Sequence, residues 1–429
     1  MGEDIKNSAA AAFYDISKIG SMNRFFVVAL VLWGCQLDAQ NWHRFRGTTG
    51  KGVFPTIELP IDWSSQDYLW SIKLPGVGHS SPVIWEEIVF TTCASPDGKN
   101  QFVLAIDTRN GKGIWKKSFP FSGSSIHKFN SYASSTPAVD QDYVFVSWAT
   151  EKSNDLHCFD HKGKEVWKKS FGAYRTQHGN GFSPTVYGNF VVVTHDHEEK
   201  SAIIALDRHT GKQIWKVERV GSKPSASTPC AHLTEEGKLQ FVSSSKSHGC
   251  YAIDAKSGKI AWETGPDTLD KRSVSSPYFA HGYFFASCGA GGRGSRFLFV
   301  KPPVDGNPKA SVARVLERNI PYVPTSLVLE KVLLLLSDAG ILTGIDLKSG
   351  EILWRERIGG NYFASPVATG KTAYAITTDG QIKSIQITNN RVRVWDIDHL
   401  RETTHNTPAF SKSGIFIRTF SRLLHLPKL

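Results

Sequence analysis

One short phrase recurs along this chain and limits the possible folds more than any other feature. The copies read LAIDTRNGKGIW (104–115), HCFDHKGKEVW (157–167), IALDRHTGKQIW (204–215), YAIDAKSGKIAW (251–262) and TGIDLKSGEILW (343–354), and a degenerate copy ends at Trp395. In each copy, alternating apolar residues lead to an Asp, a turn with Gly, and a segment that ends at Trp. This pattern predicts a β-hairpin. Its repetition predicts one repeat architecture rather than several independent domains.

Two polar positions of the phrase have predicted structural roles. The Gly is expected in a left-handed turn conformation that a Cβ would penalise. The Asp is expected to accept hydrogen bonds from its own turn rather than to catalyse. The glycines are Gly111, Gly163, Gly211, Gly258 and Gly350, and the aspartates are Asp107, Asp160, Asp207, Asp254 and Asp346.

A second recurring phrase marks another strand in each unit. It reads SSPV, STPAV, FSPTV, STPC, SSPY, VPTS, ASPV and TPAF, with prolines at positions 82, 137, 184, 229, 277, 324, 366 and 408. These prolines lie 42 to 55 residues apart, which leaves room for four short strands in each interval. Eight such units predict an all-β fold, an eight-bladed β-propeller of four-stranded antiparallel blades.

The two ends of the chain predict how the ring closes. YLWSIKL (68–74) reads as a fourth strand with no first three strands before it. The C-terminal stretch 407–426 reads as three strands with no fourth after them. Pairing the N-terminal strand with the C-terminal blade completes the eighth blade and leaves no sheet edge open between first and last blades.

The tryptophans of the repeat are interpreted as docking wedges between neighbouring blades. A large flat side chain on an outer strand can cover the turn of the next blade and bury much apolar area. The fifth blade departs from the rule, because VDGNPKASVARV (304–315) has no Trp near position 313. The predicted docking residues are Trp70, Trp115, Trp167, Trp215, Trp262, Trp354 and Trp395.

Residues 1–40 are predicted to be an N-terminal extension and a secretory signal peptide, followed by a single propeller domain over 41–429. Arg24, the apolar run FFVVALVLWG (25–34) and a small-residue zone ending at Gln40 form the signal pattern, with Met22 as the expected true start. The apolar run is too short for a permanent membrane span. LWGC also resembles a lipobox, so a lipid anchor at Cys35 is the alternative to simple cleavage. Either route predicts an exported protein, periplasmic or extracellular, or an outer-membrane lipoprotein.

Export places the remaining cysteines in an oxidising compartment. Their odd number and wide spacing predict buried thiols rather than a disulfide framework, and no CxxC pair suggests a zinc site. These residues are Cys93, Cys158, Cys230, Cys250 and Cys288.

The formal net charge of the chain is +11. A basic surface can attract nucleic acid, anionic glycans or anionic lipid. The lysines are scattered through many turns and form no dense block, which favours a role in solubility and no specific nucleic-acid partner.

The phrase A-x-D-x-x-x-G-K-x-x-W resembles the tryptophan-docking repeat of PQQ-type propellers. This superfamily includes quinoprotein alcohol dehydrogenases and the non-catalytic BamB-like propellers of outer-membrane protein assembly. NWHRFRGTTGKG, SYASSTPAVD, NGFSPTVYG and GNYFASPV resemble secreted bacterial PQQ-like repeat proteins. The dehydrogenase resemblance implies PQQ, a calcium ion and often adjacent half-cystines. This chain has no Cys-Cys pair and no CxxCH haem motif.

Two motifs suggest other sites and are interpreted as turns. GAGGRG (289–294) fits a dinucleotide fingerprint, but a strand and prolines follow it where a helix is required, so we expect a glycine-rich hairpin. THDHEE (194–199) offers His195 and His197 as metal ligands, but it falls in a turn between strands. No metal site is predicted.

A ligand site, if present, is expected at one mouth of the central funnel, where the connections between blades meet. Amide, imidazole, aromatic and guanidinium groups there suit hydrogen bonding and stacking with a polar or anionic ligand. The alternative is that these groups satisfy backbone atoms and water. The candidates are His79, Asn130, Tyr132, His178, Asn180, Arg272, Arg293, Tyr322, Asn361, Tyr362 and His405.

The sequence therefore favours an exported, non-catalytic propeller that acts as a binding or scaffold module through its funnel face. The expected partner is a protein or an anionic glycan, contact with membrane is expected only through Cys35, and a monomer is expected. Two alternatives remain: a PQQ- and calcium-dependent quinoprotein oxidoreductase, and a polysaccharide-binding or sugar-active propeller. No catalytic residue is assigned.

Overall fold

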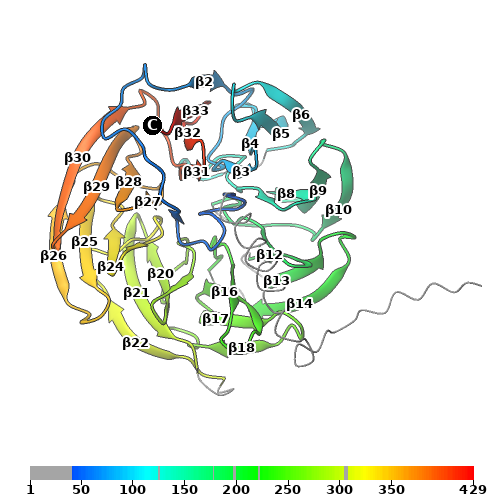
Figure 1. Cartoon of the computed structure of the whole chain (residues 1–429). Helices are drawn as coiled ribbons and strands as arrows, with labels where there is room; N and C mark the ends of the chain where they lie inside the picture. The colour runs from blue at the N-terminus through cyan, green and yellow to red at the C-terminus, as the bar shows by residue number, and fades with distance from the viewer. Residues whose placement is uncertain (1–40, 124–125, 177, 197–199, 221–222, 304–307) are drawn as a thin grey trace, which may run out of the picture. The chain divides into compact units, whose positions relative to one another are not determined.

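The computed structural model describes residues 41–123, 126–176, 178–196, 200–220, 223–303 and 308–429. The regular structure of these residues consists of β-strands, which form eight sheets. The sheets are the blades of a ring, confirming the predicted eight-bladed propeller (Figure 1). The signal peptide and the lipid anchor at Cys35 concern residues 1–40, which lie outside the described residues.

In seven of the eight blades, four strands that are consecutive in sequence are arranged in order from the channel to the rim, and the eighth takes its outermost strand from the N-terminal part of the chain. Blade 1 contains β3 (Val83–Trp85), β4 (Ile88–Ala94), β5 (Asn100–Asp107) and β6 (Gly113–Pro120), and blade 2 contains β7 (Ala138–Val139), β8 (Tyr143–Ala149), β9 (Asn154–Asp160) and β10 (Glu165–Ser170). Blade 3 contains β11 (Thr185–Tyr187), β12 (Phe190–His195), β13 (Lys200–Asp207) and β14 (Gln213–Val220), and blade 4 contains β15 (Cys230–Leu233), β16 (Leu239–Ser245), β17 (Gly249–Asp254) and β18 (Ile260–Glu263).

Blades 5 to 8 follow the same order. Blade 5 contains β19 (Tyr278–Ala280), β20 (Tyr283–Ala290), β21 (Arg293–Lys301) and β22 (Ser311–Leu316), and blade 6 contains β23 (Leu327–Leu329), β24 (Val332–Leu336), β25 (Ile341–Asp346) and β26 (Ile352–Arg357). Blade 7 contains β27 (Val367–Thr369), β28 (Thr372–Ile376), β29 (Gln381–Thr388) and β30 (Arg391–His399). Blade 8 contains β31 (Ala409–Ser411), β32 (Gly414–Arg418) and β33 (Arg422–Pro427), and β2 (Trp70–Lys73) completes it.

The eighth blade joins the two ends of the chain, as predicted. β2 pairs antiparallel with β33, with Trp70 opposite His425. At the channel, β3 of blade 1 contacts β31 of blade 8 on one side and β7 of blade 2 on the other. The guanidinium of Arg418 on β32 reinforces this junction by donating from Nη1 to the Ser80 carbonyl at 2.7 Å.

The apolar core lies between blades rather than in one central cluster. One buried cluster joins blades 1 and 2, for example, and another joins blades 3 and 4. The largest joins blades 7, 8 and 1 with Trp42 and Phe54 from the N-terminal segment. The five cysteines named above are all buried and unpaired by disulfides. Each blade is therefore stabilised mainly by its two neighbours.

Four repeat tryptophans make the same contact with the turn of the next blade. Each indole N–H donates to the carbonyl of the residue that follows the turn Asp, and each ring covers the turn Gly so closely that a Cβ there would lie within 2.9 Å of the tryptophan. The bonds are Trp70 to Thr108 (2.9 Å), Trp115 to His161 (2.7 Å), Trp167 to Arg208 (3.0 Å) and Trp215 to Ala255 (2.8 Å). Trp and Gly of the phrase thus belong to one contact between successive blades.

The turn aspartates bond to their own turns, as expected. Asp207 Oδ1 accepts from the backbone N–H of Thr210 at 2.8 Å, and Asp254 Oδ1 accepts from that of Ser257 at 2.7 Å. These hydrogen bonds stabilise the charged carboxylate and lower the pKa of both groups, against the raising effect of burial. The repeated Asp thus holds the turn that the neighbouring tryptophan covers.

Among the described residues, the other three tryptophans make no such bond to a turn of the next blade. Trp262 packs against Phe284 of blade 5, but its N–H donates to Gln240 Oε1 at 3.0 Å in its own blade. Trp354 faces blade 7, whose turn carries Asn389 and Asn390 instead of Gly. Trp395 precedes blade 8, where β33 and β2 come from opposite ends of the chain, so no turn connects them. Trp262 and Trp354 thus pack against the next blade, as predicted, but without the turn contact that the first four tryptophans make. Only at Trp395 is there no connecting turn in the next blade to cover.

Blade 5 replaces the missing tryptophan with an arginine. Arg314 on β22 lies opposite Phe299, immediately before a bulge, which is the register position that Trp115 occupies opposite Ala105 in blade 1. Its Nη1 donates to the carbonyl of Gly350 in the next turn. A guanidinium therefore bridges blades 5 and 6, as indoles bridge the successive blades 8, 1, 2, 3 and 4.

Candidate functional site

A cavity of about 500 Å³ opens at the mouth of the central channel. It is lined by residues from all eight blades and by one residue of the N-terminal segment, and none of these described residues is Asp or Glu. The lining consists of Phe45, His79, Ser81, His127, Phe129, Asn130, Ser134, Thr136, His178, Gly179, Gly181, Ser183, Ala226, Thr228, Arg272, Val274, Ser276, Gly291, Gly292, Tyr322, Val323, Thr325, Phe363, Ser365, His405 and Thr407.

The neck of this cavity is a ring of buried hydroxyl residues, here called the hydroxyl girdle: Ser81, Thr136, Ser183, Thr228, Ser276, Thr325, Ser365 and Thr407. At seven junctions the backbone N–H of one member donates to the hydroxyl oxygen of the next member, at 3.0 or 3.1 Å. Between blades 3 and 4 the Thr185 hydroxyl donates to the Pro229 carbonyl at 2.6 Å. The Ser or Thr beside each repeated Pro thus joins neighbouring blades at the channel.

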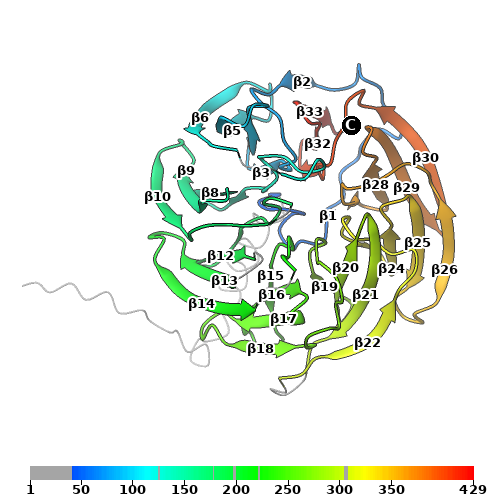
Figure 2. The same cartoon turned by 180° about the vertical axis from the view of Figure 1, so that it is seen from behind.

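The floor of the cavity is the N-terminal strap, defined as residues 41–54. Trp42 forms a bridge with Ile84 of blade 1, and the carbonyl of His43 accepts from the N–H of Val139 in blade 2 at 2.7 Å. The strap ends in β1 (Val53–Phe54), which pairs parallel with β27 of blade 7. Both views show this segment at the centre of the ring (Figures 1 and 2). Because Phe45 of the strap lines the cavity, the channel is a blind funnel with its mouth on one face.

Arg46 fixes the strap across the channel. Its side chain is 1% exposed, and it donates to the carbonyls of Ser326 at 2.7 Å and Pro366 at 2.8 Å in blades 6 and 7. Two further carbonyls, of Gly50 and Lys51, accept from it within the strap. Burial lowers the pKa of Arg46 to about 10, so the guanidinium stays charged at neutral pH.

One side of the funnel is an arc of ring contacts, here called the aromatic arc. Centroid distances between successive rings are 4.9, 5.4, 5.4, 4.6 and 4.2 Å. The rings, in order, are His178, His127, Phe129, Phe363, His405 and His79. Burial lowers the pKa of His405 to about 4 and that of His79 well below its usual value, so both imidazoles are neutral at pH 7.

The opposite side of the funnel carries a charge. The backbone of Arg272 is bridged to Gly289 on β20, whose N–H donates to the Arg272 carbonyl at 3.0 Å. Its Nε is buried and has no hydrogen-bond partner among the described residues. Nearby, burial raises the pKa of the Tyr322 hydroxyl, and the positive charge of Arg272 opposes that rise. The backbone N–H of Tyr322 donates to Asp338 Oδ2 at 2.7 Å, which fixes this residue beside the arginine.

Six of the eleven predicted site residues line this cavity: His79, Asn130, His178, Arg272, Tyr322 and His405. Asn130 also has a structural role, because its Nδ2 donates to the carbonyls of His178 at 2.5 Å and Asn180 at 3.1 Å and so joins the loops of blades 2 and 3. Asn130 therefore satisfies backbone carbonyls, the structural alternative, while it also lines the cavity.

The other five predicted residues do not line the cavity. The Tyr132 ring fills the space above Gly98 and Gly123. Asn180 Oδ1 accepts from the N–H of Phe182 in its own loop. The remaining three form a separate set: Arg293 is exposed at the β20–β21 turn, Asn361 is exposed and its carbonyl accepts from the N–H of Thr378, and Tyr362 is fully buried in the core between blades 6 and 7.

The structure adds four aromatic residues that sequence reasoning missed: Phe45, His127, Phe129 and Phe363. They lie in the strap and in connections between blades, where no repeat marks them. The hydroxyl girdle had a visible signal, since a Ser or Thr adjoins each of the eight repeated prolines. The glycine-rich motif is a hairpin as expected, with Gly291 and Gly292 at positive φ in its turn and in the cavity wall.

The histidine motif of blade 3 is only partly described. His195 is buried at the end of β12, where its Nδ1 lies 2.8 Å from Asn154 Nδ2, and His197 lies outside the described residues. Among the described residues, no group of three or more His, Cys, Asp and Glu could hold a metal ion. In the same part of the chain, no helix has the length and apolar character needed to cross a bilayer.

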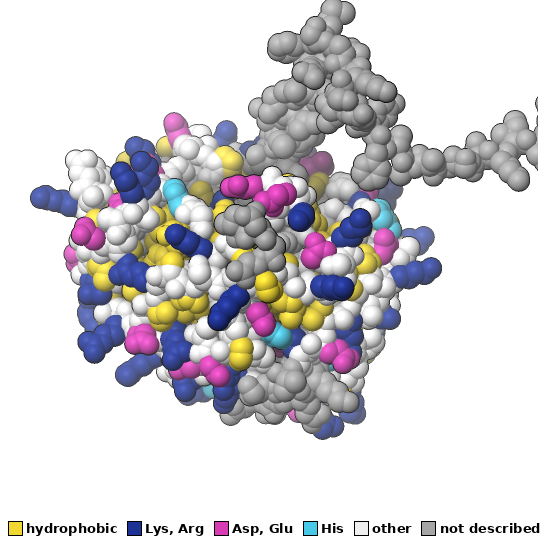
Figure 3. All heavy atoms as spheres, turned by 90° about the horizontal axis from the view of Figure 1, so that it is seen from below, with side chains coloured by type: hydrophobic (Ala, Val, Ile, Leu, Met, Phe, Trp, Pro, Cys, Tyr) yellow, Lys and Arg dark blue, Asp and Glu magenta, His cyan; other side chains and the backbone are white. Residues whose placement is uncertain are grey.

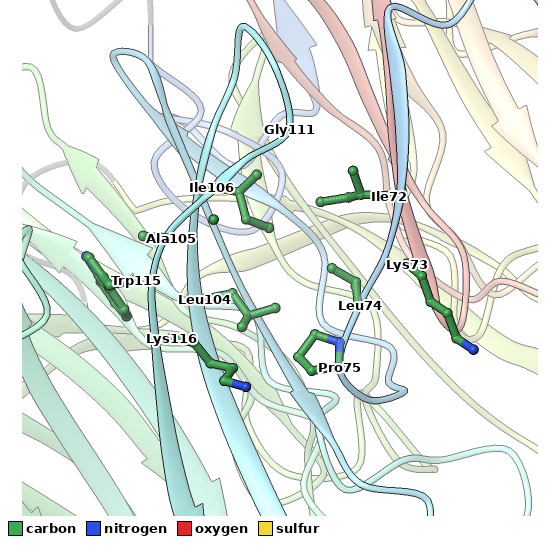
Figure 4. A pocket seen from close by; sticks show the side chains of 11 residues that line it. Ile72, Lys73, Leu74, Pro75, Leu104, Ala105, Ile106, Gly111, Trp115 and Lys116 are labelled. Carbon is green, nitrogen blue, oxygen red and sulfur yellow. The ribbon is translucent and has the colours of Figure 1, made fainter.

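A second cavity, of about 530 Å³, is a groove on the rim between blades 8 and 1. Ile72 and Leu74 face Leu104 and Ile106 across it, with the Lys116 side chain beside them (Figure 4). These side chains come from β2 and the chain after it and from β5 and β6. The groove is mostly apolar and carries no cluster of polar groups that would fix a ligand's orientation, so the funnel is the stronger site.

Comparison with known proteins gives a consistent set of matches. A family model described as "Outer membrane protein assembly factor BamB" matches residues 99–295 and 312–421. BamB of Yersinia pestis is 24% identical over 355 residues, which are 79% of this chain and 82% of that protein. BamB from Moraxella catarrhalis superposes with a TM-score of 0.56 at 13% identity, covering 83% of this chain and 96% of that one.

Quinohemoprotein alcohol dehydrogenase from Comamonas testosteroni also superposes, with a TM-score of 0.62 and 13% identity over 90% of this chain and 80% of that one. At such low identity both solved structures establish the shared fold, and the family model carries the closer relationship.

Proposed function

The chain belongs to the family of the outer membrane protein assembly factor BamB, and we propose that it is an exported, non-catalytic scaffold that binds a protein partner at the mouth of its blind funnel. The relatives are named for a role in outer-membrane protein assembly, which supports a cell-envelope location and a protein partner for this chain. The signal pattern in residues 1–40 supports the same location.

The single observation that carries the proposal is the composition of the funnel. Its described lining combines aromatic rings, hydroxyls, imidazoles and one guanidinium without any Asp or Glu, a composition that supports recognition of a partner rather than catalysis by carboxylates. Phe129 at the mouth is 51% exposed, and exposed aromatic side chains are typical anchors for protein partners. On the edge of the ring seen in Figure 3, Lys and Arg are mixed with Asp and Glu.

The quinoprotein alternative is not favoured by the donor chemistry. Calcium in proteins is held by about six to eight oxygen ligands, with carboxylates prominent among them. The described lining of the funnel offers hydroxyl, amide and imidazole groups but no carboxylate, so these residues do not fit the calcium site that PQQ catalysis requires.

Site-specific photo-crosslinking in intact cells tests the proposal. A benzophenone amino acid in place of Phe129 is expected to cross-link to a discrete envelope protein. The same probe at Tyr187, which is 45% exposed at the far end of β11, is expected to give no such adduct. A cross-linked protein at Tyr187 and none at Phe129 would place the partner surface on the other face and overturn the proposal.

A further inference from the structure

The two sides of the funnel differ in chemistry. The aromatic arc presents rings from blades 7, 8, 1, 2 and 3, and two of its partly buried imidazoles, those of His79 and His405, are uncharged at neutral pH because desolvation lowers their pKa. The facing wall presents Arg272 beside Tyr322. A ligand that satisfies both sides has a flat apolar part and a negatively charged part within one short span.

The charge of Arg272 is not neutralised within the described protein. Among the described residues, no salt bridge includes Arg272. Its guanidinium hydrogen-bonds to the Tyr322 side chain, and its buried Nε has no partner among them. Partly buried charges of this kind favour an incoming anion, because hydrogen bonds between ionised groups are stronger in surroundings of low dielectric constant. A carboxylate accepts two parallel N–H bonds from one guanidinium, which fixes its orientation as well.

Charges below and above the cavity have the same sign. Arg44 and Arg46 in the strap are buried and bonded to backbone carbonyls rather than to carboxylates. At the mouth, Lys128 Nζ lies 5.0 Å from the centroid of the Phe129 ring. These positive charges favour the approach of acidic groups to the funnel.

We propose that the funnel binds an acidic peptide segment of the partner in which an aromatic residue stands next to Asp or Glu, with the ring against the aromatic arc and the carboxylate on Arg272. This inference rests on the proposed function and names the chemistry by which the partner is held. The cavity volume, about 500 Å³, lies in the range of small-ligand pockets and suits such a pair of side chains rather than a folded domain.

Fluorescence anisotropy with defined peptides tests the proposal on the purified chain. The probe is a labelled, terminally blocked Gly-Ser-Phe-Glu-Ser-Gly peptide, compared with versions that carry Gln for Glu or Ala for Phe. The Phe-Glu peptide is expected to bind at least tenfold more tightly than either of the other two. Equal affinity of the Glu and Gln peptides, or no binding of any peptide, would overturn the proposal.

Variants of the protein assign the preference to its residues. Arg272→Gln is expected to remove the tenfold preference for Glu over Gln, and Arg272→Lys to retain part of it. Arg293→Gln is the matched control, because this exposed arginine lies at the adjacent hairpin but does not line the cavity, and its preference is expected to stay unchanged. Thermal unfolding of each variant confirms that the fold is intact. Loss of the preference in Arg293→Gln but not in Arg272→Gln would refute the assignment.

A third experiment distinguishes a peptide ligand from a small molecule with the same chemical groups. Phenylacetate carries a ring and a carboxylate without a peptide. If phenylacetate binds and the Phe-Glu peptide does not, the peptide proposal is wrong and the funnel is a small-molecule site. A partner cross-linked at Phe129 without any peptide preference would refute this inference alone, whereas peptide preference without a cross-linked partner would refute the proposed function alone.

Discussion

The channel and the rim of this propeller join the same blades by different means. At the channel, the hydroxyl girdle links successive blades with nearly identical hydrogen bonds of 3.0 or 3.1 Å. At the rim, an indole bonds to the next turn at four junctions, and a guanidinium does so at a fifth.

The difference shows at which radius the ring geometry allows the contacts between blades to vary. Near the axis the inner strands are close together and the circle must close, so one short hydrogen bond recurs at the junctions. Far from the axis the spacing is wider, and a Trp, an Arg or simple packing can fill it. The rim contacts are larger in area, so single changes there are expected to cost more than single changes at the girdle.

The largest expected effect comes from removing a docked tryptophan. Trp215→Ala is expected to lower the free energy of unfolding by about 3–5 kcal/mol, because a buried indole that contacts blade 4 is replaced by a cavity. Trp395→Ala, at the junction without a turn to cover, is expected to cost about 1 kcal/mol. Urea unfolding followed by tryptophan fluorescence measures both, and equal losses would contradict the distinction between docked and undocked tryptophans.

The glycine beneath a docked tryptophan gives the next largest effect. Gly211 has a φ of +67°, and a Cβ there would lie 2.7 Å from the Trp167 ring. Gly211→Ala is therefore expected to destabilise by about 2–3 kcal/mol through backbone strain and steric overlap together.

Gly237→Ala is the control for that measurement. Gly237 has a φ of +75° but no atom within 4 Å of its Cβ position, so backbone strain alone applies and the expected cost is about 1 kcal/mol. Chemical denaturation compares the two variants, and similar costs would show that the tryptophan contact adds nothing to the turn.

A single change in the hydroxyl girdle is expected to have a smaller effect. Thr325→Val keeps the shape of the side chain but removes the acceptor for the buried N–H of Ser276. The expected loss is about 1–2 kcal/mol in the urea titration, the cost of one unsatisfied buried donor. Thr325→Ser retains the oxygen and should stay near the parent. A loss in the Val variant as large as that of Trp215→Ala would reverse the ranking of channel and rim.

Acidification gives an effect that is absent at neutral pH. His425, at the rim of blade 8, is stacked on Phe416 at 4.2 Å, and burial lowers its pKa to about 4. The unfolded state has the ordinary, higher pKa and binds the proton first as the pH falls. The stability contributed by the neutral ring is therefore complete above about pH 6.5 and is lost as the pH falls toward 4.

His43 in the strap, with a pKa lowered to about 3 by burial, should act in the same direction at the channel. Urea midpoints measured from pH 7 to pH 4.5 test both histidines. His425→Gln and His43→Gln are each expected to show a shallower fall than the parent chain, and parallel curves would mean that neither buried ring contributes to the pH dependence.

The repeat predicted most of the fold because it is local and periodic. The spacing of the eight prolines and the unpaired strand 68–74 were sufficient for the blade number and the closure. Whether a repeat tryptophan covers a turn depends on the blade that follows it. The predicted closure already implied that the outer strands of blade 8 are not connected by a turn, so the absence of a turn contact at Trp395 could have been predicted. The substitution of Arg314 for a tryptophan could not be read from side-chain type, because its role depends on register.

The funnel was less predictable for a physical reason. Its floor and much of its aromatic arc come from segments outside the repeat, and their contacts join residues far apart in sequence. The Phe129–Phe363 ring contact, for example, joins two loops that no local pattern relates. The girdle, in contrast, repeats with the blades, and its hydroxyls were visible in the sequence although their role was not.

The strap also sets an order of events in time. Arg46 bonds to carbonyls 280 and 320 positions later in the chain. When the chain emerges from a ribosome or a translocation channel N-terminus first, Arg46 of the strap has no carbonyls of blades 6 and 7 to bond until those blades have also emerged. The strap is thus among the first parts to be made and among the last to be locked, and only a nearly complete ring can hold it.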